Sequence, residues 1–405
     1  MIRFLTAGES HGPALNAIIE GFPAGLDLDV HDLQGDLTRR RGGYGRGGRM
    51  KIEGDEVTIL SGVRLGLTLG SPITLQIKNK DWQRWEKVMA VGASPDNTMG
   101  NVEIAADDKL TQLSARVTAP RPGHADLAGV LKYQQDDIRN ILERASARET
   151  AARAAVGAVA RKFLSEFQIE VFSGVVRIGN AAVEKTPTDL GIYREKVLQS
   201  PVSAPDELVS EQMMAEIDQA KQSGNSLGGI IEVIIQGAPV GLGSHVQWDR
   251  RLDARLAAAM MSIPAIKGVE IGLGFEASTL KGSEVHDSIC YDSLKGFYRQ
   301  TNNAGGIEGG ISNGELIRIQ IAMKPIPTLY QPLQTVDLDT REPKQASVER
   351  SDTCAVPAAA VVAEAMACWV IAEAFMEKFG GDHLQETRCN YQNYLQKMNA
   401  RIRSC

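Results

Sequence analysis

The sequence predicts an α+β fold, because alternating segments typical of strands are interspersed with longer segments typical of helices. Strands are expected where apolar and polar residues alternate between glycine or proline boundaries, at 70–79, 228–239 and 314–325. Helices are expected at 144–164, 207–224, 249–262 and about 355–379. No short repeat and no Ser/Pro-rich linker divides the chain. We therefore expect one compact unit in which sheets pack against helices.

Two of the expected helices have distinctive compositions. Small residues dominate one face of the range 144–164, which favours close packing against a neighbouring element. The range 355–376 is the longest apolar stretch, but Glu364 and Glu373 interrupt it. Carboxylates are rare in membrane-spanning helices, so this stretch predicts a buried helix of a folded domain.

The overall composition is that of an ordinary globular protein, with 405 residues, 43% hydrophobic residues and 23% charged residues. A net charge of −6 argues against general nucleic-acid binding. None of the five cysteines forms a C-x-x-C pair, which disfavours a zinc site or a disulfide framework and favours the reducing cytoplasm. The N-terminal segment has no apolar run of signal-peptide length.

Residues 39–49, RRRGGYGRGGR, concentrate five arginines in this acidic chain. Gly43, Gly45 and Gly48 have the spacing of a dinucleotide-binding loop, but the polar residues before them do not form the strand that this motif requires. A solvated basic loop is one alternative. Because glycines let a loop fold back and arginine forks match carboxylates and phosphates, the segment favours a site for a multiply charged small anion.

Two histidines lie in irregular turns rich in glycine or proline. His11 is in GESHGPAL, and His124 is in APRPGHAD with Arg121 close by. A lone histidine is more often structural than catalytic. Together with the arginine run, however, two histidines in rigid loops indicate acid–base chemistry on an anion.

Three further segments can contribute to such a site. TNNAGGIEGGISNG (301–314) can hold a phosphate or a flat ring through backbone N–H groups, or it can be a glycine-rich hairpin. KPIPTL (324–329) follows a strand and is rigid. Asp352 precedes a helix and can be its N-cap. We interpret Cys354 as a small buried thiol and not as a nucleophile, because no histidine is near it in sequence.

These segments together resemble the chorismate synthase family. The shared motifs are GESHG, RRRGGYGRGGRM, RPGHAD, RASARETAARAAVGAVA, TNNAGGIEGGISNG, KPIPT and RSDTCAVPAAAVVAEAM. The resemblance extends from Arg3 to about Phe379. It implies a β-α-β sandwich with internal duplication, one catalytic domain over residues 1–380 and a C-terminal tail at 381–405, which we expect to be mobile.

The resemblance also implies an activity. The family converts 5-enolpyruvylshikimate 3-phosphate to chorismate by an anti 1,4-elimination of phosphate. It requires reduced FMN, although the reaction has no net redox change. Members of the family either reduce FMN with their own NADPH-dependent activity or depend on a separate flavin reductase, and NADPH enters only as a source of reducing equivalents. Because the sequence has no additional reductase-sized domain, an external flavin reductase is favoured. A cytoplasmic homotetramer with no nucleic-acid or membrane partner is implied.

The family's functional positions fall on the following residues. The catalytic positions are those of His11, His124 and Asp352, and the substrate-binding positions are those of Ser10, Arg40, Arg46 and Arg49. The FMN-binding positions are those of Arg144, Ala145, Ser146, Pro264, Ala265, Gly309, Lys324, Pro325, Ile326, Pro327, Thr328 and Arg350.

The chain departs from the common family pattern at three positions. Ser351 replaces a histidine, Ala145 replaces a serine, and Pro264 replaces an asparagine. At 145 and 264 only backbone contacts to FMN are then expected. Two other functions remain open on the same residues: a flavin-dependent oxidoreductase acting on a phosphorylated carboxylic acid, and a non-catalytic anion-binding protein.

Overall fold

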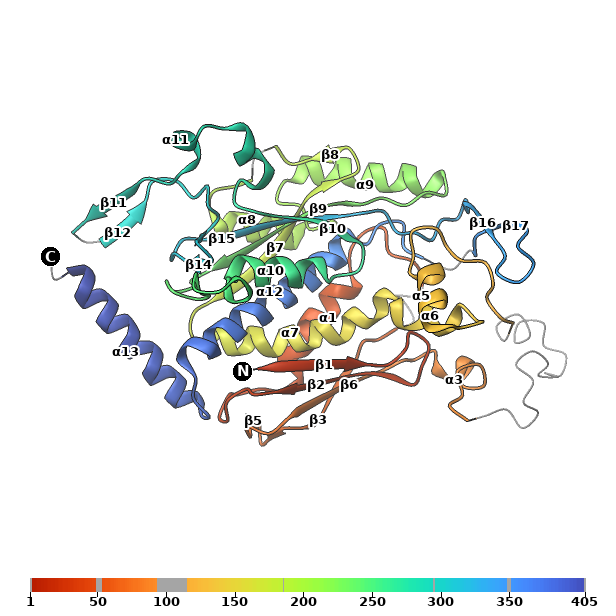
Figure 1. The fold of residues 1–405 in the computed structure, drawn as a ribbon, viewed down its shortest axis with the longest axis horizontal. Coiled ribbons are helices and arrows are strands. Elements are labelled where there is room, and N and C mark those ends of the chain that lie inside the picture. The colour runs from red at the N-terminus through yellow and green to blue at the C-terminus, as the bar shows by residue number, and fades with distance from the viewer. Residues whose placement is uncertain are drawn as a thin grey trace.

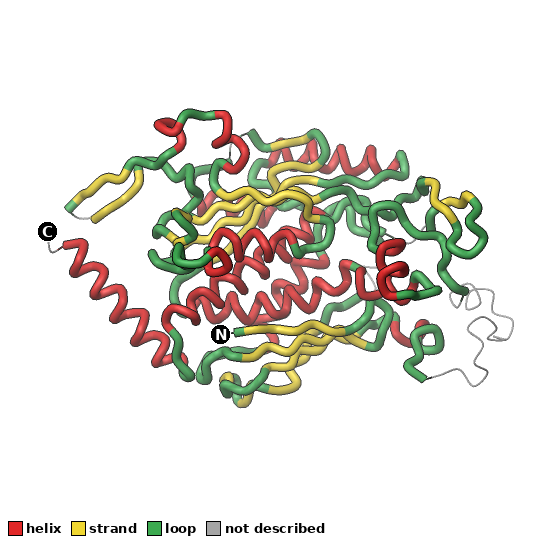
Figure 2. Tube along the Cα trace, in the orientation of Figure 1, coloured by secondary structure: helices red, strands yellow, loops and turns green. Residues whose placement is uncertain are grey.

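Two antiparallel sheets enclose a layer of helices, so the predicted β-α-β sandwich is confirmed (Figure 1). Helices fill the space between the two groups of strands (Figure 2). The computed structural model describes residues 2–48, 53–92, 115–184, 186–293, 296–347 and 351–403.

The first sheet is formed by the N-terminal segment. Its strand order is β1-β2-β6-β3, and every neighbouring pair is antiparallel. In β6, Ile73, Leu75 and Ile77 are buried and alternate with less buried residues, as the period-two pattern predicts. The bounds are β1 Arg3–Ala7, β2 Ala14–Glu20, β3 Val57–Ser61 and β6 Ile73–Lys78, with α1 (Val30–Arg41) between β2 and β3.

The second sheet has the strand order β10-β15-β9-β7-β8, again with antiparallel neighbours. Strands β9 and β15 confirm the strands expected at 228–239 and 314–325. The bounds are β7 Glu170–Ile178, β8 Ala181–Ala182, β9 Gly229–Gln236, β10 Ile266–Ile271 and β15 Ile317–Met323, with α10 (Leu252–Met261) between β9 and β10.

The order of these elements shows the internal duplication. Each half runs strand, strand, helix, strand, strand, and a long helix follows. The first half is β1, β2, α1, β3, β6 and α7 (Thr150–Ser165). The second is β7, β9, α10, β10, β15 and α12 (Val356–Phe379). In both sheets the second strand pairs with the first and the fourth, and the third strand pairs with the fourth. The periodicity of the sequence did not reveal this repeat.

The helices α7 and α12 cross closely in the middle of the sandwich. A Cβ atom on Gly157 of α7 would lie 2.2 Å from the Cβ of Ala365 of α12. Helix α7 packs on β2 and β6, whereas α12 packs on β7 and β9. Helix α12 is long and apolar enough to span a membrane, but 94% of its most apolar window is buried inside the protein. The expected buried helix is therefore confirmed.

A buried carboxylate joins three helices beside this crossing. Arg39 of α1 donates to both oxygens of Glu364 of α12 at 2.7 Å, and Arg161 of α7 donates to one of them at 2.7 Å. Ser173 of β7 also donates to Glu364. Burial alone would raise the pKa of Glu364, but the two arginines outweigh it and lower the pKa. The ion pairs therefore hold α1, α7, α12 and the second sheet in register.

The remaining elements surround the sandwich. The expected helix at 144–164 is interrupted at Ser146, where the chain turns between α6 and α7. Residues 384–403 form the helix α13, which extends outward with the β11–β12 hairpin at the end opposite α6 (Figure 1). The bounds are β4 Val63–Arg64, β5 Leu67–Thr68, α3 Trp82–Trp85, α5 Asp126–Tyr133, α6 Arg139–Ala145, α8 Leu190–Gln199, α9 Glu207–Gln222, α11 Gly282–Val285, β11 Ile289–Asp292, β12 Gly296–Arg299, β13 Ile307–Glu308, β14 Ile311–Ser312, β16 Gln334–Val336, β17 Pro343–Gln345 and α13 Leu384–Arg403.

The helix crossing predicts opposite effects of the same substitution at two helical glycines. Gly157→Ala should lower the free energy of unfolding by about 1–3 kcal/mol, because the added methyl group overlaps Ala365. Gly35→Ala in α1 should raise it by about 0.5–1 kcal/mol, because Gly35 has no atom within 4 Å of an added Cβ. Denaturant unfolding of both variants measures the difference. Equal stability of the two would contradict the packing argument.

Candidate active site

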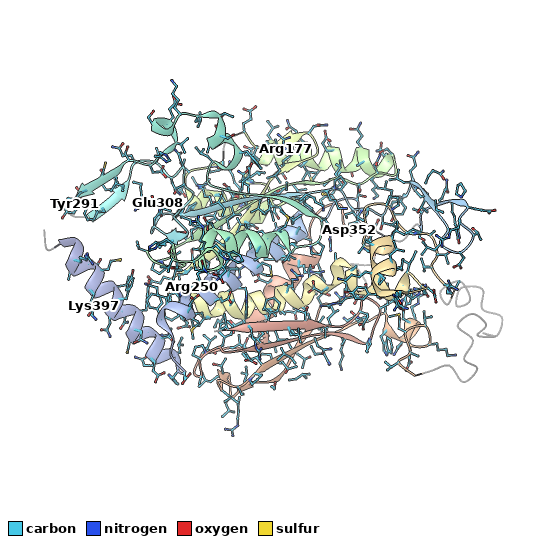
Figure 3. The ribbon with its side chains drawn as sticks, in the orientation of Figure 1. Arg177, Arg250, Tyr291, Glu308, Asp352 and Lys397 are labelled. Atoms are coloured by element: carbon cyan, nitrogen blue, oxygen red, sulfur yellow. The ribbon has the colours of Figure 1, made fainter. Side chains whose placement is uncertain are left out.

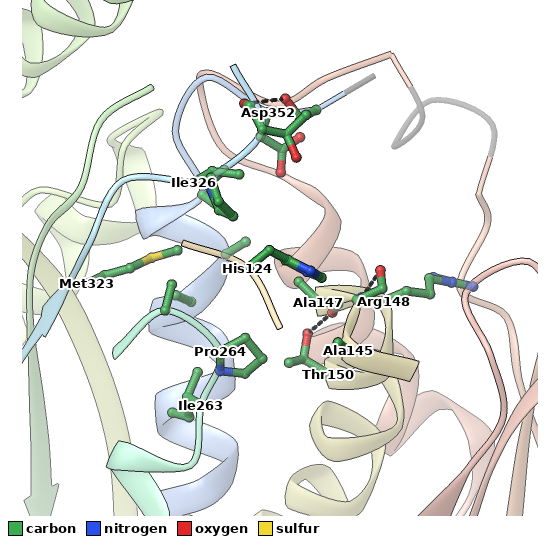
Figure 4. A pocket seen from close by; sticks show the side chains of 18 of the residues that line it. His124, Ala145, Ala147, Arg148, Thr150, Ile263, Pro264, Met323, Ile326 and Asp352 are labelled. Carbon is green, nitrogen blue, oxygen red and sulfur yellow. Dashed lines mark hydrogen bonds between the residues drawn. The ribbon is translucent and has the colours of Figure 1, made fainter. Parts of the chain in front are cut away.

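A cavity of about 610 Å³ lies at the end of the helical layer where α1 ends and α7 and α12 begin. In Figure 4, Ala147 and Thr150 lie on one side of His124 and Pro264 lies on the other. The N-termini of two long helices carry partial positive charge, so this end of the layer favours an anion.

The charged groups of the cavity wall are mostly cations. Among the described residues, six arginines and lysines line it, whereas Asp352 is the sole lining carboxylate. The cations are Arg40, Arg46, Arg121, Arg148, Lys267 and Lys324. Burial and the neighbouring Lys267 lower the pKa of Lys324. Such a surplus of positive charge suits a ligand with several negative charges.

Arg46 and Asp352 form a pair at the rim of this cationic wall. Arg46 Nη1 lies 2.5 Å from Asp352 Oδ2, and the backbone N–H of Gly47 donates to Asp352 Oδ1 at 2.6 Å. Arg46 Nε is buried and has no partner among the described residues. The glycines allow this contact, because a Cβ on Gly47 would lie 2.7 Å from the carbonyl oxygen of Ser351. An unpaired buried N–H of this kind indicates a missing acceptor.

Asp55, a carboxylate behind the wall, holds two more of the buried arginines. Arg40 donates to Asp55 at 3.0 Å and to Thr150 at 3.0 Å. Arg148 donates to Asp55 and, at 3.0 Å, to Asn79. Burial and the neighbouring arginines lower the pKa of Arg40 to about 10, against the opposing effect of Asp55. Arg40 therefore remains charged near neutral pH, with its position fixed from behind.

His11 is held from two sides. Its backbone N–H donates to Glu143 Oε2 at 2.7 Å, and its ring atom Nδ1 lies 2.7 Å from Glu143 Oε1. The ring stacks on Trp85, with centroids 4.0 Å apart and an interplanar angle of 25°. Ser10 donates to Ser146 at 3.1 Å, which ties the same turn to the end of α6. His11 therefore lines the cavity with little rotational freedom.

His124 belongs to a second buried network. Its Nδ1 contacts Asp126 Oδ1, and Arg121 Nε donates to Asp126 Oδ2 at 2.9 Å. Arg121 also donates to Thr328, which anchors the segment after β15. Burial alone would raise the pKa of Asp126, but the hydrogen bonds from His124 and Arg121 hold it well below its usual range.

Apolar side chains form another part of the wall. They include Leu142, Met261, Ile263, Pro264, Ile266, Met323, Ile326, Pro327, Ala358, Ala359 and Val362. Ala265 has a φ of 69°, in the left-handed region, and its carbonyl accepts from the backbone of Lys324 at 2.9 Å. A cavity lined by both apolar and cationic residues fits a flavin nucleotide, which combines a flat ring with phosphate.

The structure brings most of the predicted site residues together. Those that line the cavity are Ser10, His11, Arg40, Arg46, His124, Ala145, Ser146, Pro264, Ala265, Lys324, Ile326, Pro327, Thr328 and Asp352. Pro325 lies between two lining residues and is not itself in the wall. Arg49 and Arg350 lie outside the described residues.

Two predicted site residues, Arg144 and Gly309, do not line the cavity. Arg144 binds the carbonyl oxygens of Gly8 and Thr6 at 3.1 and 3.0 Å and so braces the turn of His11 from outside the cavity. Gly309 is in the β13–β14 hairpin, which corresponds to the hairpin interpretation of 301–314. Its neighbour Glu308 lies well away from Asp352 along the molecule (Figure 3).

Several lining or supporting residues were not singled out from the sequence. Arg148 and Thr150 lie within the motif RASARETAARAAVGAVA but are not distinguished in it, Glu143 directly precedes this motif, and Lys267 lies in β10. They are recognised as parts of the site only because the fold brings them close to Arg40, Lys324 or His11. Arg121 was noted only as the neighbour of His124, although it is the centre of the network around Asp126.

Comparison with known proteins decides the family. The family model of chorismate synthase matches residues 2–376. The chain belongs to the chorismate synthase family. It is similar to the chorismate synthase of Geobacter sulfurreducens, with 57% identity over 99% of this chain and 100% of that protein. It is also similar to that of Moorella thermoacetica, with 56% identity over 98% of this chain and 100% of the relative. A crystal structure of chorismate synthase superposes with a TM-score of 0.76 and 43% identity, covering 100% of this chain and 99% of that one.

Family membership fixes the class of reaction. Chorismate synthases are carbon–oxygen lyases of aromatic amino-acid biosynthesis, and they eliminate phosphate from 5-enolpyruvylshikimate 3-phosphate to give chorismate. The family implies a small-molecule substrate and a flavin cofactor. The cationic and apolar walls of the cavity are consistent with both.

Arg46 provides a test of the cationic wall. Arg46→Ala should weaken substrate binding about ten- to a hundred-fold, because a charge-assisted hydrogen bond is lost and Asp352 is left without its arginine. Arg3→Ala, which removes an exposed arginine paired with Glu20, should leave the affinity unchanged. Calorimetric titration with substrate measures both. Unchanged affinity in Arg46→Ala would place Arg46 outside the binding site.

The cysteines predict a pattern of chemical modification. Cys354 is fully buried, and burial raises its pKa to about 11, which agrees with its interpretation as a structural thiol. Cys389 on α13 is exposed. Iodoacetamide at neutral pH should therefore modify Cys389 in the native protein. Cys354 should stay unmodified, and the activity should not change. Mass spectrometry locates the label, and inactivation in parallel with labelling of Cys354 would refute this.

Proposed function

We propose that the cavity is the site at which phosphate is eliminated from 5-enolpyruvylshikimate 3-phosphate in a reaction that depends on reduced FMN. One observation carries the proposal. Among the described residues, six cations, two histidines and a single carboxylate line one cavity that also has an apolar wall. An elimination that expels phosphate and removes a ring proton needs an anion site, an acid and a base, and the cavity holds candidates for each.

The cations would bind the phosphate and the two carboxylates of the substrate. Arg40 and Arg148 keep their positions through Asp55, so binding requires little reorganisation of either guanidinium. Arg46 Nε is a buried donor that still lacks an acceptor. Ser10 adds a hydroxyl beside His11. Arg49 remains a predicted substrate-binding residue outside the described part of the chain.

His11 would donate a proton to the departing phosphate, and Asp352 would help to accept the ring proton. Each oxygen of Asp352 already accepts one hydrogen bond, from Arg46 or from Gly47, but a carboxylate oxygen has a second lone pair. His124, fixed by Asp126, would hold a proton beside the flavin ring. The chemistry that reduced FMN would supply, when bound, is the transient loan of an electron, which would ease carbon–oxygen cleavage with no net redox change.

The residues fit a flavin at the apolar wall. Ile326 and Pro327 offer surface for a flat ring, while Lys324 and Ser146 offer polar contacts. Ala145 and Pro264 would contact FMN through their backbone groups only, and Ala265 remains a predicted FMN contact beside them. Arg144, Pro325, Thr328, Gly309 and Arg350 remain predicted contacts on the strength of the family motifs.

We further infer the setting of the enzyme from its family. A homotetramer in the cytoplasm is expected, with FMN reduced by an external flavin reductase and NADPH serving only as the source of electrons. Light scattering at micromolar concentration gives the assembly state, and a monomer near 44 kDa would contradict the tetramer.

Turnover without consumption of reductant is the decisive test. Enzyme, excess substrate and substoichiometric reduced FMN are mixed under strict anaerobiosis. Phosphate release should exceed the flavin many-fold, and the flavin spectrum should end as it began. One phosphate per flavin, with oxidised flavin at the end, would favour the flavin-dependent oxidoreductase instead. Binding of substrate with no phosphate release in the presence of reduced FMN would favour a non-catalytic anion-binding protein.

A further inference from the structure

A buried carboxylate without an assigned role contacts His11. Glu143 lies near the end of α6, and only 2% of its surface is exposed. Both of its oxygens are used by one residue: Oε2 accepts the backbone N–H of His11, and Oε1 contacts the ring atom Nδ1, each at 2.7 Å. The backbone carbonyl of Glu143 also accepts from Ser10 at 3.1 Å.

Within the described part of the chain, His11 is the one ionisable side chain that contacts the carboxylate of Glu143. Among the described residues, no arginine or lysine lies within ion-pairing distance of its carboxylate. Asp126, the equivalent partner of His124, differs in this respect because Arg121 donates to both of its oxygens. A buried carboxylate requires a positive or strongly donating partner. His11 is therefore the group that must satisfy Glu143.

The second ring nitrogen of His11, Nε2, makes no hydrogen bond within the part of the chain that the structure describes. The ring lines the cavity. Trp85 covers one face of the ring and restricts its rotation. A carboxylate accepts and cannot donate, so Nδ1 must carry the hydrogen of the bond to Oε1. The geometry leaves Nε2 as the atom that faces the ligand.

We propose that Glu143 is a positioning residue that keeps a proton on Nδ1 of His11 and directs Nε2 at the phosphate of the substrate. The proposal rests on the proposed role of His11 as the acid. In the step, the Nε2–H bond breaks and its electron pair stays on Nε2, while an O–H bond forms on the departing phosphate. Nδ1 keeps its proton, so the imidazolium becomes a neutral imidazole whose tautomer Glu143 fixes.

The substitution Glu143→Gln removes the charge but keeps the size. An amide has one acceptor oxygen for the two donors of His11, so its NH₂ group must face either the backbone N–H or Nδ1. We expect kcat to fall about 10²-fold, in the range of a lost general acid. The dissociation constant of the substrate, measured without flavin, should change less than about threefold, because the arginines bind it.

A double-mutant cycle separates positioning from a structural role. Glu143→Gln should lower kcat in the parent but have no further effect beyond about twofold in the His11→Asn background, because it acts through His11. The same loss in both backgrounds would overturn the proposal. So would a kcat of Glu143→Gln within twofold of the parent. Glu232→Gln is the matched control, since Glu232 is also buried but pairs with Arg318 in the second sheet.

A readout that needs no turnover keeps this test separate from that of the proposed function. NMR of protein labelled with ¹⁵N-histidine reports which ring nitrogens carry protons, and His11→Asn assigns the signals. Nδ1 of His11 should be protonated in the parent and should lose or exchange this proton in Glu143→Gln. An unprotonated Nδ1 in the parent would overturn the role of Glu143, whether or not the enzyme eliminates phosphate.

Discussion

The close crossing of α7 and α12 is the constraint on which the rest of the structure depends. Gly157 allows the two helices to approach until only a small residue, Ala365, fits between them. Beside this contact, Glu364 pairs with Arg39 and Arg161 and so fixes α1 against both helices. Because α1 ends, and α7 and α12 begin, at the same end of the layer, the three helices deliver their terminal residues to one cavity.

Three of the arginines that line the cavity are held by carboxylates that lie behind its wall. Asp55 pairs with Arg40 and Arg148, and Asp126 pairs with Arg121. These pairs offset the cost of burying guanidinium groups, and the three arginines still line the cavity. A multiply charged anion can then bind to groups that are already in place, which lowers the reorganisation needed before the chemistry begins.

The two histidines are supported in different ways. His124 shares Asp126 with Arg121, so its network is part of the cationic wall. His11 has Glu143 to itself and a ring, Trp85, against one face. In the first arrangement Arg121 balances the charge of Asp126 within the protein. In the second, Glu143 is proposed to keep Nε2 of His11 directed at the ligand as a hydrogen-bond donor. This difference fits one histidine beside the cofactor and one acid at the leaving group.

The sequence alone determined the local structure and the family motifs. Alternation over 314–325 predicted β15, the alanine-rich stretch after Ala355 predicted α12, and the turns of His11 and His124 marked the site. These features depend on neighbours in the chain, which the sequence displays directly. The break at Ser146, the repeated strand order and the partnership of Glu143 with His11 depended on the tertiary structure. Glu143 and His11 are 132 residues apart, and only the packing of α6 against the N-terminal turn brings them together.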